Sequence, residues 1–98
     1  MTVKPTSLEA YDSIDLNERQ AEVLRAICEL YAAGLHPSDQ EIASHLGWPI
    51  NRVTGRRGEL AAAGIVQKSG LKPGPTGRMV MAWMPVPKQL LLQLGIAS

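Results

Sequence analysis

Apolar residues recur at helical spacing in the first third of the chain. One stripe at this spacing holds Ala21, Leu24, Ile27, Cys28 and Tyr31. The spacing predicts an amphipathic helix. Asn17 and Gln20 have the residue types of a capping box, and Leu16 stands before the cap as a hydrophobic staple. We expect this helix to run to Ala33, with Gly34 as its stop.

Two shorter helices are predicted next, joined by a glycine turn. Ser38 supplies an N-cap oxygen and Glu41 completes a capping box, so the first helix should begin at the intervening Asp39. Gly47 ends that helix, and Pro49 suits the first turn of a second one running to about residue 63. The pattern indicates a helix-turn-helix.

After Gly64 the pattern changes from helical spacing to alternation. The run IVQKS is typical of a strand, GLKPGPTG is dense in turn formers, and RMVMAWM alternates as a strand does. These stretches predict a β-hairpin. Period two places Met79, Met81 and Trp83 on one face, which we expect to cover the helices. A methionine stripe can also be a binding surface, but core filling is its commoner role.

Three small or branched residues carry a resemblance to helix-turn-helix DNA-binding proteins. Ala43, Gly47 and Val53 occupy the fifth, ninth and fifteenth places of a motif that starts at Asp39. Ala lets the two helices approach, Gly takes the left-handed turn, and Val locks the second helix to the first. With VTGRRGEL, AAAGIV and PTGRMVMAW in order, residues 7–84 resemble the small winged helix-turn-helix proteins of bacteria and their phages.

That resemblance implies an α+β fold, mainly α with a small β-hairpin, and sequence-specific binding of double-stranded DNA by a transcriptional regulator. An interaction module or inhibitor subunit without DNA binding is the alternative, because winged helices also serve as protein-binding domains. The modest charge and the apolar tail suit that alternative. Affinity for DNA that falls steeply with salt would separate the two.

Length and composition allow a single domain. The chain has 98 residues with 45% apolar content. We divide it into a flexible start at 1–6, the winged helix-turn-helix domain at 7–84 and an apolar tail at 85–98. The tail contains four leucines between Leu90 and Leu94, too few apolar residues for a membrane span of ~20. They either join two copies in a homodimer or close the core of the monomer.

Catalytic, metal and redox chemistry find little support in the sequence. The single Cys28 cannot form an internal disulfide, and no signal segment opens the chain, so we expect a cytoplasmic protein with a buried thiol rather than a redox sensor. His36 and His45 lack the partners that metal-ligand spacing requires. No catalytic triad or phosphate-cradling loop is present, so we expect no enzyme, metal or cofactor.

Charge is divided unevenly along the chain. The net charge is +1, but residues 1–35 carry three basic and six acidic residues, whereas 36–84 carry six basic and three acidic ones. This division predicts a phosphate-facing side and an acidic back, with ordinary solvated charges as the alternative.

A helical wheel centred on Val53 assigns the residues of the second motif helix to two sides. The outward side holds Asn51, Arg52, Gly55, Gly58 and Glu59. Asn51 is expected to pair with adenine, and Arg52 to reach a guanine edge or a phosphate. Gly55 and Gly58 each weaken a helix by about 1 kcal/mol. They favour close approach of the backbone to DNA, or else a helix distorted toward 3₁₀ geometry.

Further contacts are expected to the phosphate backbone. Ser38 and Gln40 begin the first motif helix, Arg56 lies on the flank of the second, and cations bracket the wing tip. The complete expected DNA-binding set is Ser38, Gln40, Asn51, Arg52, Thr54, Gly55, Arg56, Lys68, Lys72 and Arg78.

Arg57 lies near the inward stripe, where a charge cannot be buried unpaired. We expect its stem to pack inside, with the guanidinium tied to an acid of an earlier helix or turned to a phosphate. The expected structural residues of the motif are Ala43, Gly47, Val53, Arg57 and Leu60.

Overall fold

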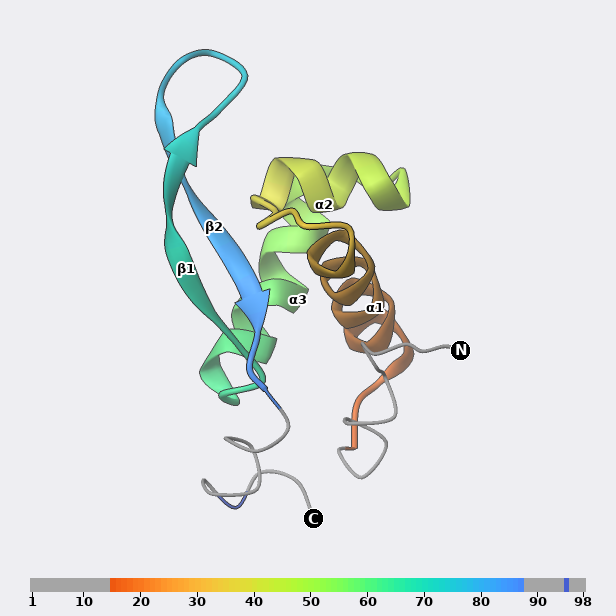
Figure 1. Ribbon diagram of the computed structural model, residues 1–98. Helices are drawn as coiled ribbons and strands as arrows, with labels where there is room; N and C mark the ends of the chain where they lie inside the picture. Colours follow the sequence, from red (N-terminus) through yellow and green to blue (C-terminus); the bar gives the residue numbers. More distant parts are fainter. Residues whose placement is uncertain (1–14, 88–94, 96–98) are drawn as a thin grey trace.

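Three helices precede an antiparallel hairpin in the computed structural model, which describes residues 15–87 and 95. The elements are α1 (Glu18–Ala32), α2 (Asp39–Leu46), α3 (Ile50–Ala62), β1 (Val66–Pro73) and β2 (Met79–Pro85). The helices pack together, and the hairpin stands beside them with its tip projecting past α2 (Figure 1). This is a winged helix-turn-helix layout, so the predicted α+β fold is confirmed.

Two capping boxes fix where α1 and α2 begin. Gln20 N donates to Asn17 Oδ1 at 2.8 Å, and Asn17 N donates to Gln20 Oε1 at 3.1 Å. Before α2, Ser38 N donates to Glu41 Oε1 at 2.9 Å, and Glu41 N donates to Ser38 Oγ at 3.3 Å. Each box gives partners to amides at the helix start that have none inside the helix. Both predictions are confirmed.

The turn between α2 and α3 follows the predicted chemistry with a small shift. Gly47 has φ +71°, in the left-handed region that other residues enter only with strain. Pro49 is the N-cap of α3, not its first helical residue. The C-terminal ends of α1 and α3 lie at Ala32 and Ala62, each about one residue earlier than expected.

The core lies between the three helices and the base of the hairpin. Its buried members are Val23, Leu24, Ala26, Ile27, Cys28, Ile42, Ala43, Val53, Leu60, Ile65, Val66, Trp83 and Val86. The predicted stripe of α1 was partly wrong, because Tyr31 is exposed while Val23 and Ala26 are buried. Helices α2 and α3 and strand β2 all contact α1, so this helix buries a broader face than one stripe.

Strand β2 is paired on both of its edges. On one side β1 pairs with it antiparallel, from Val66 opposite Pro85 to Pro73 opposite Met79, with a bulge between Lys68 and Gly70. On the other side, the segment before α2 adds an isolated bridge between Ser38 and Ala82. Because the ladder with β2 extends to Pro73, β1 includes the first residues of the turn-rich stretch GLKPGPTG, which the sequence assigned to the turn.

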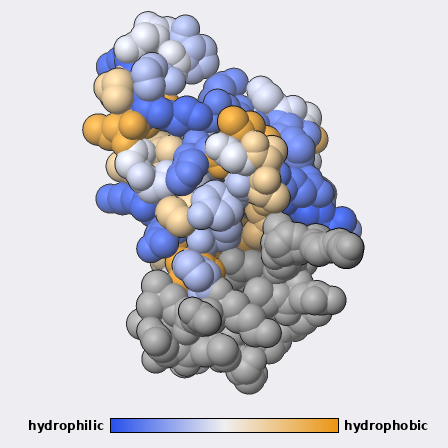
Figure 2. All heavy atoms as spheres, in the orientation of Figure 1, coloured by the Kyte–Doolittle hydropathy of each residue, from blue (hydrophilic) through white to orange (hydrophobic). Residues whose placement is uncertain are grey.

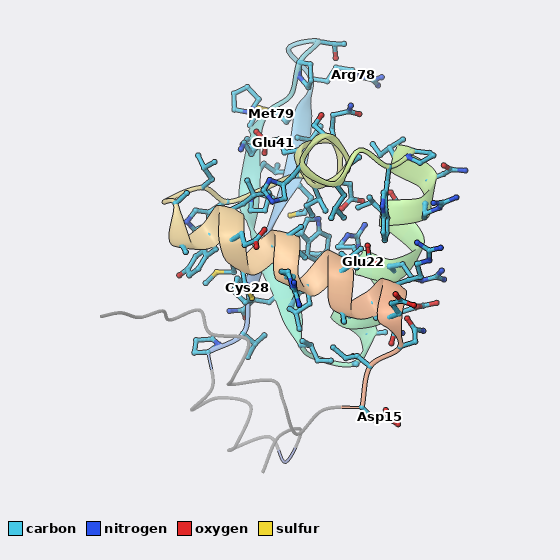
Figure 3. The ribbon with its side chains drawn as sticks, turned by 90° about the vertical axis from the view of Figure 1, so that its right-hand side faces the viewer. Asp15, Glu22, Cys28, Glu41, Arg78 and Met79 are labelled. Atoms are coloured by element: carbon cyan, nitrogen blue, oxygen red, sulfur yellow. The ribbon has the colours of Figure 1, made fainter. Side chains whose placement is uncertain are left out.

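Only part of the predicted methionine face covers the helices. Trp83 is in the core, and Met81 is partly buried against it. Met79 is 56% exposed, because the outer half of the hairpin extends beyond the helices (Figures 1 and 3). The expectation that Met79 packs on the helices was wrong.

The base of the hairpin continues the core past the predicted domain end at residue 84. Val86 is buried, and its N–H donates to Ile65 O at 2.9 Å. The expected flexible start and most of the leucine-rich tail lie outside the described residues. Within the described part of the chain, no helix has the length and apolarity needed to cross a membrane.

Candidate nucleic-acid interface

The outward side of α3 is open to solvent from its first turn. Asn51 and Arg52 are exposed, whereas Val53 behind them is fully buried. Gly55 and Gly58 follow on the outward side, and a Cβ placed on either would have no heavy atom within 4 Å. No internal contact therefore requires glycine there. The helix is also regular α throughout, so 3₁₀ distortion does not account for the glycines.

Arg57 occupies the inward position that the wheel gave it. Its Nε and Nη2 donate to Asp39 Oδ1 and Oδ2 at 2.8 and 2.7 Å, and its Cζ lies 4.0 Å from the centroid of the Trp83 ring. The side chains of Arg57 and Asp39 are only 14% and 17% exposed. The predicted pairing with an acid of an earlier helix is confirmed.

Thr54 is drawn into the same junction. Its hydroxyl donates to Asp39 Oδ2 at 3.0 Å, so one carboxylate at the start of α2 holds two successive turns of α3. Thr54 is exposed, but its hydroxyl proton is committed to Asp39. Thr54 therefore ties the two motif helices together, and its expected contact with DNA stays a prediction.

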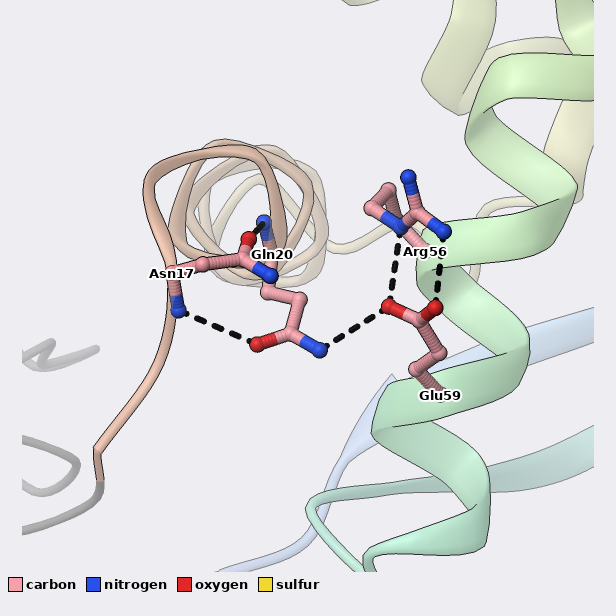
Figure 4. A network of polar contacts seen from close by, with 4 residues as sticks. All are labelled: Asn17, Gln20, Arg56 and Glu59. Carbon is pink, nitrogen blue, oxygen red and sulfur yellow. Dashed lines mark hydrogen bonds and ion pairs between the residues drawn. The ribbon is translucent and has the colours of Figure 1, made fainter.

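Arg56 is paired within its own helix. Its Nε and Nη2 donate to Glu59 Oε1 and Oε2 at 2.8 and 2.7 Å, and Gln20 Nε2 of α1 donates to Glu59 Oε1 at 2.9 Å (Figure 4). The hydrogen bond from Arg56, helped by that from Gln20, lowers the pKa of Glu59, and Glu59 in turn raises the pKa of Arg56.

This network changes two expectations. Glu59 does not simply face outward toward a groove, because it joins α3 to the first turn of α1. Arg56 is a weaker candidate for phosphate than predicted, because a phosphate must compete with a bidentate carboxylate for the same N–H groups. The wheel treated α3 as an isolated helix and could not show that α1 approaches this flank.

Lys72 points back to the helices. Its Nζ donates to Glu41 Oε1 at 2.7 Å and to His36 O at 3.1 Å. Burial is the largest single influence on Glu41 and raises its pKa, but the hydrogen bonds and charge of Lys72 and the bonds of Ser38 together outweigh it and lower that pKa. Lys72 thus ties the wing to the start of α2, which makes it a weaker candidate for a phosphate contact than predicted.

The other wing cations lie at opposite ends of the hairpin. Lys68 lines a hollow with Ala61 and Gly64, beside the end of α3, so it does not bracket the tip as expected. Arg78 is exposed at the tip and points away from the hairpin, toward the side of the view where α3 lies (Figure 3). Of the three predicted wing contacts, Arg78 alone stands free at the tip.

The two residues expected to bind phosphate at the start of α2 differ. Ser38 is only 4% exposed, and in the capping box its N–H donates to Glu41 while its hydroxyl oxygen accepts from the Glu41 amide. Pairing of this segment with β2 covers it, so Ser38 is a weaker candidate for a phosphate contact than predicted. Gln40 is exposed and stays a candidate.

Ion pairing leaves only three of the six basic residues in 36–84 without an acidic partner among the described residues. Each of the three acids in this region has a basic partner: Asp39 with Arg57, Glu41 with Lys72, and Glu59 with Arg56. The remaining cations are Arg52, Lys68 and Arg78. Among the described residues, none of these three forms an ion pair.

Sequence reasoning missed a cluster around Trp48, in the turn of the motif. The Cζ of Arg52 lies 5.7 Å from the centroid of the indole ring, and the Cζ of Arg19, from α1, lies 5.6 Å from it. Arg19 and Trp48 are 29 positions apart, so no local pattern indicates that they meet. The Trp-Pro pair after the glycine turn was the only available signal.

Groups capable of other chemistry are occupied or buried. Burial, and to a lesser extent the charge of Glu29, raises the pKa of the Cys28 thiol to about 12. His45 Nε2 lies 2.8 Å from Glu29 Oε1, and the His36 ring meets Tyr31 edge to face. The described residues hold no group of three side chains suited to a metal ion.

Comparison with known proteins identifies no relative of this chain. No protein-family model matches the chain, and no curated protein sequence matches it.

Proposed function

We propose that the chain binds double-stranded DNA in a sequence-specific manner, with α3 in the major groove and the hairpin tip against the adjacent backbone. A transcriptional regulator of bacterial or phage type, working in the cytoplasm, is the role that the motif resemblance favours. Asn51 would read a base edge, Arg52 a base or a phosphate, and Arg78 a phosphate near the tip.

The outward side of α3 carries this proposal. Exposed Asn51 and Arg52 adjoin Gly55 and Gly58, whose outward sides are open. Two glycines inside a helix cost about 1 kcal/mol each relative to alanine, and no internal contact here offsets that cost. Binding of a partner that requires close approach of the helix backbone would offset the cost of the two glycines. A groove about 12 Å wide that admits a helix of 10–12 Å diameter is such a partner.

The distribution of unpaired positive charge also supports the outward side of α3 as the DNA-binding surface. The cations left without acids include Arg52 on α3 and Arg78 at the tip. Two or three phosphate contacts would give a plot of log affinity against log salt with a slope of about −2 to −3. Titration of a random-sequence duplex with the protein between 50 and 300 mM salt, by fluorescence anisotropy, tests this. Absence of binding at the lowest salt overturns the proposal.

The exposed apolar face of the hairpin favours a second candidate, a protein-binding module. Leu71 and Met79 are 62% and 56% exposed, and they share one face because their partners across the ladder are Met81 and Pro73. Apolar surface is visible on the hairpin below its tip (Figure 2). A double variant, Leu71→Ser with Met79→Gln, should leave DNA affinity unchanged if the first proposal is correct.

We further propose that two copies associate through the tail, so that a two-fold DNA site is bound. The support is compositional, since four leucines fall between Leu90 and Leu94 and cannot share one face of a helix. Sedimentation of the protein at tens of micromolar decides it, and a monomer there overturns the dimer.

A further inference from the structure

Two arginines from different helices share one tryptophan. Arg19 stands in the first turn of α1 and Arg52 in the first turn of α3, and each places its Cζ within 6 Å of the Trp48 ring centroid. Trp48 itself is partly buried against the core. A rigid indole therefore brings together two cations that lie 33 positions apart in the sequence.

Neither guanidinium forms a hydrogen-bonded ion pair with an acid among the described residues. Arg19 forms only a loose ion pair, because its Nη1 lies 3.9 Å from Glu22 Oε2, beyond hydrogen-bonding distance, and the two side chains are 56% and 40% exposed. Arg52 has no ion pair in the described part of the chain. An aromatic face attracts a cation but accepts none of its in-plane N–H groups. Most of the donors of both arginines are therefore available to an external anion.

The contact between the two helices is held independently of the arginines. Gln20, next to Arg19, completes the capping box of α1 through Asn17 and also donates to Glu59 of α3 (Figure 4). The first turn of α1 is thus anchored to α3 one residue away from Arg19. The two cations are presented from a fixed junction, which lowers the ordering cost of binding an anion between them.

We propose that Arg19, Trp48 and Arg52 form a phosphate site that holds the DNA backbone where it passes the first turns of α1 and α3. This inference rests on the proposed function and extends the interface to a third element. Planar guanidinium groups suit the paired oxygens of a phosphodiester. The site fixes position and adds affinity without reading sequence, and it requires that Trp48 keep both arginines in place.

The decisive variant is Arg19→Gln, because Arg19 is exposed and outside the core. We expect its affinity for a random-sequence duplex to fall about five- to tenfold at 0.1 M salt, and the salt slope to shrink by about 0.9, as for one lost phosphate contact. Base preference should not change. Arg25→Gln is the matched control, since Arg25 lies on the same helix and the change in net charge is identical. It should reproduce neither effect.

Trp48→Leu tests the positioning role of the indole. This variant keeps apolar bulk and both charges but removes the aromatic face. We expect a loss of affinity similar to that of Arg19→Gln, with a melting temperature that shows the domain to be folded. If Trp48→Leu fails to fold, Trp48→Phe, with a smaller ring, replaces it and should give a smaller loss.

The outcomes separate this inference from the proposed function. If the parent protein binds no duplex at 50 mM salt, the proposed function fails and the phosphate site fails with it. If the parent binds while Arg19→Gln and Arg25→Gln both match it in affinity and slope, the site is overturned and DNA binding stands. If inorganic phosphate quenches tryptophan fluorescence saturably, and Arg19→Gln loses this quenching but binds the duplex with the affinity and slope of the parent, the site belongs to a free anion and the DNA assignment is overturned.

Discussion

The inward and outward sides of α3 use similar residues in opposite ways. Inward, Arg57 is bound by Asp39, packed on Trp83 and largely shielded from water. Outward, Arg52 lies over the Trp48 ring and forms no ion pair among the described residues, and a Cβ at the neighbouring Gly55 would meet open space. The inward arginine is bound by an acid of the protein itself, whereas the outward side leaves arginine donors and space unused.

The contrast teaches that residue type alone does not identify a binding residue. Arg56 and Arg57 are consecutive, yet one pairs with Glu59 at the surface and the other with Asp39 beneath it. What separates a structural arginine from one available to a ligand is the number of its donors already used. Within the part of the chain that the structure describes, Arg19, Arg52 and Arg78 donate no side-chain hydrogen bond to an acid, and they are the arginines that we assign to the proposed DNA interface.

The largest effect should come from the inward side. Arg57→Ala leaves Asp39 with a partly buried charge and Trp83 without its covering group, so we expect a loss of about 2–3 kcal/mol in the free energy of unfolding. For a domain of this size the melting temperature should fall by about 10–20 °C. Arg56→Ala, the neighbouring control, should melt close to the parent. The reverse order of stability would contradict the assignment of the two sides.

The outward side should respond in recognition instead. Asn51→Ala removes a side chain that makes no internal hydrogen bond in our description, so the fold should be unaffected. We expect preference for one base pair of the selected site to weaken by about 1–3 kcal/mol, measured by competition among single-base variants of that site. An equal loss on every duplex would show that Asn51 does not read a base.

Gly55→Ala should move stability and function in opposite directions. Alanine raises helix propensity by about 1 kcal/mol, and the open space admits its Cβ without a clash. The protein should therefore melt higher while its affinity for DNA falls. If Gly55→Ala is more stable than the parent and binds DNA as tightly, the backbone at Gly55 does not approach DNA closely. Comparison with Gly58→Ala locates the nearest point of contact along α3.

The smallest effect concerns the tie between wing and α2. The pKa of Glu41 is lower in the folded protein than in the unfolded chain. Its ion pair with Lys72 therefore stabilises the protein at pH values above the pKa of the unfolded chain. This stabilisation is lost as the pH falls through the pKa of Glu41 in the folded protein. The pair is substantially exposed, so about 0.5 kcal/mol is expected. Glu41→Gln should lose less stability than the parent between pH 5 and pH 3. Parallel curves would show that the charge of Glu41 contributes nothing.

Local signals in the sequence located the helices well. Asn17 with Gln20 and Ser38 with Glu41 are contacts over three residues, so their types and spacing suffice to predict them. The same holds for Gly47, whose left-handed turn depends on its own backbone. Arg57 was predictable because burying a charge forces a partner, although the sequence could not choose between an acid and a phosphate.

Contacts between distant segments were not predictable in this way. Lys72 meets Glu41 across 31 positions, and Gln20 meets Glu59 across 39. Burial of Ser38 depends on its bridge to Ala82, and exposure of Met79 depends on how far the hairpin extends past the helices. Each follows from how the wing and α1 dock, which periodicity along one element cannot specify.

Cys28 gives the molecule a built-in reporter of its own unfolding. It is the sole cysteine of the chain, it is 2% exposed, and its pKa of about 12 keeps the thiol protonated at neutral pH. A thiol reagent can modify it only after α1 separates from the helices and strand that cover it. The labelling rate therefore measures how often this core opens, and a slower rate in the presence of a duplex would report the proposed binding independently.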